Sequence, residues 1–165
     1  MAIKQSQQGF ALLIAIIFMS VMLTFGLALG SIAYKQSILA SDSLRSHSAF
    51  YVADAALECA FYADQQLNLF THPPSDPGSA NAPVITCDAA PAISSNEVWS
   101  STRWVVSSRF SLDGGTHCAD VTVSKPAQST GGTTYLFAQG YDVSCATVGS
   151  PSGARFASRG LRAHY

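Results

Sequence analysis

One stretch constrains this chain more than any other. From Phe10 to Tyr34 the sequence contains no Asp, Glu, Lys, Arg, His or Pro. A run of about 20 apolar residues is enough for a helix that crosses a bilayer. The segment 10–34 therefore predicts a helix that belongs in a membrane at some stage, and the polar residues 1–9 before it form a leader that is too short to fold.

Three interpretations of this segment compete. A secretory signal peptide would be removed, and Ala28-Leu29-Gly30 offers small residues for cleavage, but the apolar run is long for a signal sequence. An ordinary single-span anchor is the second interpretation. The third depends on the motif Gln8-Gly9-Phe10-Ala11-Leu12-Leu13, which follows a short basic leader and opens a helix that becomes amphipathic.

This motif resembles the N-terminus of type IV pilins and pseudopilins. The resemblance implies that a prepilin peptidase cuts between Gly9 and Phe10, and that Phe10 is then N-methylated as the first mature residue. Most members carry a glutamate at the fifth mature position, which here is Ile14. The subset that lacks it resembles PilX/GspK-type minor pilins, thought to sit at the filament tip, so the resemblance implies a minor subunit.

The composition limits the classes of function. Charged residues make up 12% of the chain, against about 25% in ordinary proteins, which suits an extracytoplasmic or filament-packed protein. The net charge of −1 gives no sign of a nucleic-acid partner from bulk charge. The resemblance implies a single-pass precursor in the inner membrane, followed by an extracellular pilus or a periplasmic pseudopilus.

The helix is expected to continue through residues 35–70, because the first proline is Pro73. A helix from Phe10 to Leu69 would be about 90 Å long at 1.5 Å per residue. Small or apolar residues recur in steps of three and four, as on a helix that lies against a domain: Ala49, Val52, Ala53, Ala56, Ala60, Ala63 and Leu67. The positions expected to be exposed carry Asp42, Arg45, Asp54 and Asp64.

Residues 71–101 have the character of a loop. Five of the seven prolines fall between Pro73 and Pro91, and Asp76-Pro77-Gly78-Ser79 is strong turn chemistry. A loop of this length inside a compact domain is often functional or mobile.

Residues 102–165 alternate with period two and predict an antiparallel sheet of about four strands. Turns are expected at 113–115, 131–132 and 150–153, and Gly140 is a candidate β-bulge in the third strand. Together with the helix this predicts an α+β fold, a meander packed on one long helix. It agrees with the pilin fold that the N-terminal resemblance implies.

The four cysteines predict disulfides, because their number is even, their spacing is wide and the chain carries an export signal. We favour Cys59–Cys87, which would tie the loop to the helix, and Cys118–Cys145. A two-residue turn at Gly131-Gly132 would place residues 118 and 145 opposite each other. That register also sets Val121 opposite Asp142 and not opposite Val143, so the pairing stays open among three connectivities.

No catalytic constellation is visible, and we expect a protein that is not an enzyme and has no cofactor or metal. Weak candidates for ligand binding are His117-Cys118 for zinc, Asp113 and Asp120 for calcium, and Arg155, Arg159 and Arg162 for DNA. Zinc needs four converging ligands and calcium needs spaced oxygens, which are missing here. Arginines on a terminal strand more often prevent aggregation, so DNA is a disfavoured partner.

The leading hypothesis is a structural protein, a tip or assembly-initiating minor pilin of a type IV pilus or a related type II secretion filament. Its partners would be other pilin and minor pilin subunits, the inner membrane and the prepilin peptidase. The alternative is a membrane-anchored or secreted binding module with a disulfide-stabilised β domain. Whether such a filament serves adhesion, motility, DNA uptake or secretion stays open.

Overall fold

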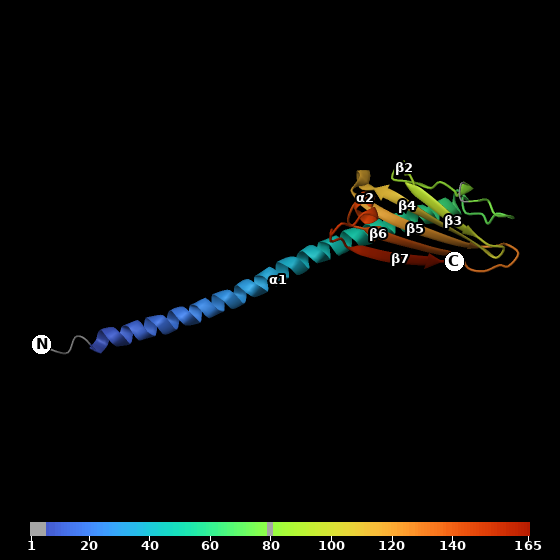
Figure 1. Ribbon diagram of the computed structural model, residues 1–165. Coiled ribbons are helices and arrows are strands. Elements are labelled where there is room, and N and C mark those ends of the chain that lie inside the picture. The colour runs from blue at the N-terminus through green and yellow to red at the C-terminus, as the bar shows by residue number, and fades with distance from the viewer. Residues whose placement is uncertain (1–5, 79–80) are drawn as a thin grey trace. The chain divides into compact units, whose positions relative to one another are not determined.

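The computed structural model describes residues 6–78 and 81–165, so residues 1–5 of the predicted leader and residues 79–80 of the predicted loop lie outside the described chain. The chain divides into unit 1, Met1–Asp42, and unit 2, Ser43–Tyr165. Helix α1, Ser6–Gln65, contributes to both (Figure 1). The expectation of one long helix is confirmed, but it begins within the predicted leader and ends four residues early.

Unit 2 contains a five-stranded antiparallel sheet with strand order β3-β4-β5-β6-β7 and a separate two-stranded sheet (Figure 1). The α+β class is confirmed, and the estimate of about four strands is wrong. The strands are β1 Thr86–Cys87, β2 Ala90–Pro91, β3 Ser94–Trp99, β4 Arg103–Leu112, β5 His117–Pro126, β6 Tyr135–Tyr141 and β7 Ser158–His164.

The missed strand β3 lies within residues 71–101, which were expected to be a loop. Its first four residues, Ser94 to Glu97, are all polar, so no apolar alternation marks it. It is nevertheless paired with β4 along its whole length, from Ser94 opposite Arg109 to Trp99 opposite Trp104. An edge strand can be this polar because it has a neighbour on one side only.

The second half of α1 packs on the inner face of the sheet with a row of alanines. Ala49, Ala53, Ala56, Ala60 and Ala63 are each at most 1% exposed. The predicted helical stripe is confirmed for these positions, since small side chains allow a close approach of helix and sheet.

Two other assignments on α1 are wrong. Leu67 lies beyond the end of the helix and is 52% exposed. Asp64 was expected in solvent but is 3% exposed, because it points to the sheet and pairs with Lys125. The chain then turns through Asn68, whose φ is 52°, and brings Phe70 into the core.

The inner faces of β4 and β5 follow the predicted alternation, with Val106 opposite Val123 and Phe110 opposite Ala119. A short 3₁₀ turn, η2 Asp113–Gly115, joins the two strands where a hairpin turn was expected.

The third and fourth strands, expected over 135–146 and 155–165, are shorter in the structure. Strand β6 ends at Tyr141 and is followed by a short helix, α2 Cys145–Gly149. Gly140 is no bulge, because it pairs regularly with Ala119. Instead, a Cβ atom there would overlap the backbone of α1.

Candidate functional site

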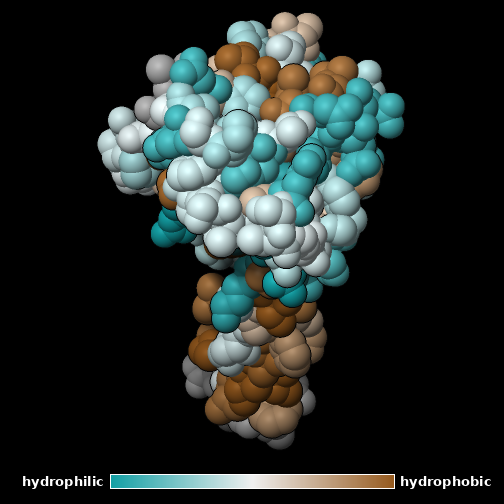
Figure 2. All heavy atoms as spheres, turned by 90° about the vertical axis from the view of Figure 1, so that its right-hand side faces the viewer, coloured by the Kyte–Doolittle hydropathy of each residue, from teal (hydrophilic) through white to brown (hydrophobic). Residues whose placement is uncertain are grey.

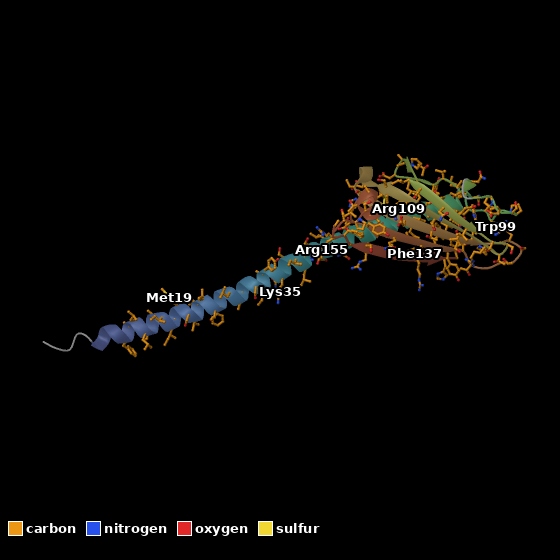
Figure 3. The ribbon with its side chains drawn as sticks, viewed as in Figure 1. Met19, Lys35, Trp99, Arg109, Phe137 and Arg155 are labelled. Carbon is orange, nitrogen blue, oxygen red and sulfur yellow. A yellow bond between two sulfur atoms is a disulfide. The ribbon has the colours of Figure 1, made fainter. Side chains whose placement is uncertain are left out.

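The apolar segment of unit 1 is the feature of the described chain that most needs an environment other than water. Within residues 9–65 an 18-residue window is long and apolar enough to cross a membrane, and none of it is buried. Its large side chains, such as Met19 (labelled in Figure 3), are exposed, from 45% at Val21 to 76% at Met19. An exposed apolar surface of this size marks contact with lipid or with another protein.

The three serine and threonine hydroxyls inside this segment are all bonded within the helix itself. Ser20 donates to the carbonyl oxygen of Ile17, Thr24 to that of Val21 and Ser31 to that of Ala28, each at 2.8 Å. In hydrocarbon an unpaired polar group costs several kcal/mol. The segment therefore carries no side-chain hydroxyl between Phe10 and Ala33 that would resist entry into an apolar medium.

The residues of the predicted processing site lie at the start of this segment. Gly9 and Phe10 are consecutive in α1, and no atom lies within 4 Å of the position a Cβ would take at Gly9. Ile14 is one turn further along and is 49% exposed.

Both disulfides form in unit 2 with the pairs that the sequence favoured. Cys59 in α1 is joined to Cys87 in β1, with the Cα atoms 6.0 Å apart, and Cys118 in β5 to Cys145 in α2, at 4.7 Å. The reason given for the second pair was wrong. Cys118 lies opposite Tyr141, and Cys145 reaches it because the chain turns back through α2.

A hydrogen-bonded chain that sequence reasoning missed links α1 to the β4–β5 turn. Ser48 Oγ lies 3.0 Å from Nε2 of His117. The hydrogen-bond partner of Nδ1 of His117 is Thr116 Oγ1 at 2.9 Å, while Oδ2 of Asp113 lies farther away, at 3.3 Å. The spacing of 69 residues between Ser48 and His117 leaves no local signal for this link. Ser48, His117 and Asp113 help to line a pocket of about 560 Å³.

The order serine, histidine, aspartate is that of hydrolases that form an acyl-enzyme, so its chemistry needs testing against the geometry. Such catalysis needs backbone N–H groups aimed at the oxyanion. The N–H groups of Ser48 and Ala49 lie in the interior of α1 and are used within the helix. Asp113 is 78% exposed, so water weakens its hold on the imidazole. We interpret the contacts of Ser48, His117 and Asp113 as a structural link between α1 and the β4–β5 turn.

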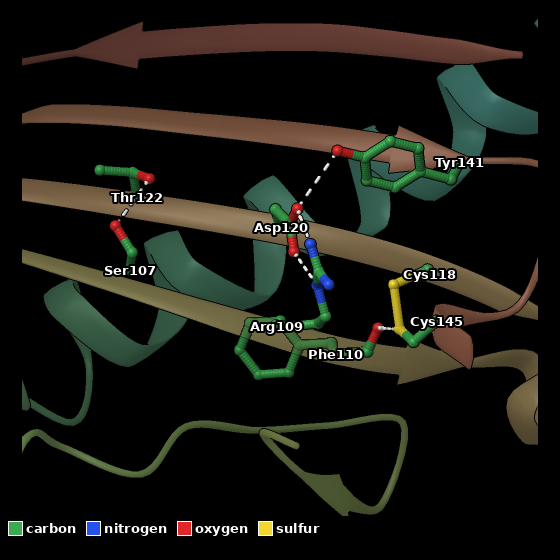
Figure 4. A network of polar contacts seen from close by, with 8 residues as sticks. All are labelled: Ser107, Arg109, Phe110, Cys118, Asp120, Thr122, Tyr141 and Cys145. Atoms are coloured by element: carbon green, nitrogen blue, oxygen red, sulfur yellow. Dashed lines mark hydrogen bonds and ion pairs between the residues drawn. A yellow bond between two sulfur atoms is a disulfide. The ribbon is translucent and has the colours of Figure 1, made fainter. Parts of the chain in front are cut away.

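The outer face of the sheet carries a polar network (Figure 4). Arg109 donates to both carboxylate oxygens of Asp120, at 2.6 and 2.7 Å, and Tyr141 donates its hydroxyl to the same carboxylate at 3.2 Å. The hydrogen bond to Asp120 raises the pKa of Arg109. Burial, then repulsion from Asp120, raises the pKa of Tyr141. Asp120, a weak calcium candidate, is therefore committed to this ion pair.

The remaining candidates for metal or DNA do not converge. Cys118 is in a disulfide, and residues 6–78 and 81–165 hold no group of three His, Cys, Asp or Glu that could bind a metal. Arg159 donates to Ser46 Oγ at 2.7 Å. Arg162, three residues along β7, points to the other face of the sheet. Arg155 (labelled in Figure 3) precedes this strand, and its carbonyl oxygen accepts from Nη1 of Arg45 at 3.4 Å.

Comparison of the chain with protein-family models, with curated proteins and with solved structures gives no match in any of the three.

Proposed function

We propose that this chain is a minor pilin-like subunit, at the tip or in the initiation of assembly, of a type IV pilus or a related type II secretion filament. The observation that carries the proposal is the exposed apolar segment Phe10–Tyr34, in which the hydroxyls of Ser20, Thr24 and Ser31 are bonded inside the helix. The same helix, α1, supplies the alanine row of the disulfide-bonded unit 2. A subunit that is first stored in a membrane and then packed among other apolar helices needs these two properties in one helix.

The mechanism follows from the exposed surface. The apolar segment is stable in lipid, and it is equally stable in a bundle of similar helices, because both remove its side chains from water. Transfer between these environments costs little as long as the segment carries no charge. Unit 2 would remain on the aqueous side of the membrane in both states. Its two disulfides fit this location, because disulfides persist in oxidising compartments outside the cytosol.

The tip role is supported by Ile14, which stands where the resemblance leads one to expect glutamate. A carboxylate at this depth would need a partner, such as the amine of a neighbouring subunit. A subunit with no neighbour beyond it does not need that pairing. Restoring the carboxylate with Ile14→Glu should therefore change the number of filaments only modestly.

The mature N-terminus tests the proposal directly. Mass spectrometry of the protein from its native host should find a chain that begins with N-methylated Phe10. A chain that begins near Ser31 would instead favour the secreted binding module. Immunogold labelling tests the position separately: label at filament ends supports the tip role, and even label along the filaments would overturn it.

A further inference from the structure

A second pocket of unit 2 lies at the end of the sheet where β3 turns into β4 and β5 connects to β6. Figure 3 labels Trp99 at this end and Arg155 near the opposite end of the unit. The pocket has a volume of about 410 Å³, and six of its side chains carry the argument: Thr71, His72, Trp99, Ser101, Gln128 and Ser129.

The lining combines one large ring with neutral hydrogen-bonding groups. Of the described residues around the pocket, none is Asp, Glu, Lys or Arg. Hydroxyl and amide groups both donate and accept hydrogen bonds, and Trp99 offers an aromatic face. Figure 2 looks onto this end of the unit, where the surface is mainly hydrophilic or intermediate in hydropathy.

The aromatic wall is held in place. The indole Nε1–H of Trp99 donates to the carbonyl oxygen of Pro73 at 3.2 Å, and the rings of His72 and Trp99 are 6.1 Å apart. His72 Nε2 lies 3.1 Å from the carbonyl oxygen of Ser100. Because a carbonyl can only accept, Nε2 carries a hydrogen and donates it to Ser100, which fixes the orientation of the His72 ring.

The opposite wall is fixed to the same end of the sheet. The N–H of Ala127 donates to the carbonyl oxygen of Thr102 at 2.9 Å, and the N–H of Thr130 donates to that of Ala127 at 3.1 Å. Gln128 and Ser129 therefore sit in a short turn anchored to the β3–β4 connection. A pocket whose walls are already ordered loses less entropy when a ligand binds.

We propose that this pocket binds a neutral saccharide. The apolar C–H face of a sugar ring stacks on an aromatic face such as that of Trp99, and its hydroxyls match groups that donate and accept. The volume lies within the range of about 300–1,000 Å³ that is usual for small-ligand sites. A nucleic acid fits poorly, because its phosphates need cationic partners that this lining lacks.

The binding of a saccharide does not depend on the filament. Only its use, contact between a filament tip and a glycan-bearing surface, rests on the proposed function. The two ideas can therefore fail separately, since the mature N-terminus is measured in a different experiment.

The experiment titrates the full chain, purified in a phosphocholine detergent because maltoside detergents carry a sugar themselves. The probes are lactose, mannobiose and N,N′-diacetylchitobiose. Binding is measured by isothermal titration calorimetry and by tryptophan fluorescence. The chain has two tryptophans, and Trp104 is only 4% exposed, so a saccharide should change the emission of Trp99. We expect saturable binding of at least one disaccharide and a loss of about tenfold or more in affinity for Trp99→Ala.

Trp99 also touches the core, so a second variant keeps the test independent of folding. Gln128 is exposed, and Gln128→Ala should weaken binding about threefold to tenfold through the loss of a hydrogen bond. Val98→Ala is the matched control, because Val98 is 64% exposed on the same strand but faces away from the pocket; its affinity should equal that of the wild type. Absence of binding to all three disaccharides at millimolar concentration, unchanged affinity of both pocket variants, or binding of a single-stranded oligonucleotide alone would overturn the proposal.

Discussion

Gly140 in strand β6 lies against the backbone of Ala53 in α1 with no space for a side chain between them. A Cβ atom on Gly140 would overlap the amide nitrogen of Ala53 and the carbonyl oxygen of Ala49. Because the obstacle is helix backbone, no change of rotamer can relieve the overlap. Helix and sheet meet backbone to backbone at this point, and the alanine row of α1 extends the contact along the helix.

Gly140→Ala should lower the free energy of unfolding of unit 2 by about 1–3 kcal/mol, the usual cost of overpacking a core. The measurement is denaturant unfolding of the full chain in detergent, followed by near-UV circular dichroism. Gly149→Ala is the control, since no atom lies within 4 Å of its added Cβ. Equal stabilities for the two variants would contradict the close approach of helix and sheet.

Asp64→Ala should destabilise unit 2 by about 3 kcal/mol. Both carboxylate oxygens of Asp64 accept from Lys125 Nζ, at 2.7 and 2.6 Å, and Tyr165 donates its hydroxyl to the same group. Loss of one member of a buried ion pair costs about 3–5 kcal/mol, and the lower end applies because the Lys125 side chain is 25% exposed. Unfolding curves should show no comparable change for Glu58→Ala, an exposed position on the same helix.

A double variant separates the ion pair from the packing at this site. Asp64→Leu combined with Lys125→Met removes both charges, so it should recover part of the stability lost in Asp64→Ala. If the double variant were less stable than Asp64→Ala, the cost would come from packing and not from an unpaired charge.

Tyr141 should make the stability fall in alkaline solution. Burial and Asp120 raise the pKa of its phenol in the folded chain, while the unfolded value is about 10. The contribution is therefore complete below about pH 10 and is lost as the pH rises through the folded pKa, since the unfolded chain releases its proton first. Between pH 8 and pH 11, Tyr141→Phe should lose less stability than the wild type, and Tyr62→Phe, an exposed control, should behave like the wild type.

Removal of the second disulfide, by Cys118→Ser with Cys145→Ser, should lower the stability of unit 2 by about 2–4 kcal/mol. The bond closes a loop of 27 residues between strand β5 and helix α2. Peptide mapping without reduction should recover Cys118 linked to Cys145 and Cys59 linked to Cys87. A peptide that joins Cys59 to Cys118 would contradict both pairs.

Gly9→Val should block processing, because a β-branched side chain does not fit a site that takes glycine in the proteins the N-terminus resembles. The variant should keep its leader, migrate at precursor size and fail to enter filaments. Folding is not expected to change, since no atom lies within 4 Å of an added Cβ at this position. A variant that still runs at mature size would count against a pilin-type leader.

The sequence by itself determined the features that follow from local patterns. The absence of charge and proline between Phe10 and Tyr34 predicts an apolar helix whatever the rest of the chain does. The spacing of the alanines from Ala49 to Ala63 indicates which side of the helix is buried. The alternation from Trp104 to Leu112 indicates the same for the strand. A helix and a strand have different periods, so these segments could be assigned without knowledge of their partners.

Only the tertiary structure decided the features that depend on which segments meet. The first four residues of strand β3 are polar, and the strand forms by pairing with β4, so no apolar alternation within it predicts it. From the sequence Asp64 is expected on the surface, because its partner Lys125 is 61 positions away and only the fold brings the two together. Gly140 is ambiguous between a bulge and a close approach until α1 is placed on the sheet. In each case the outcome depends on the energy of a contact between residues far apart in the chain. A local sequence pattern indicates that a residue is buried, but it does not indicate which residue it contacts.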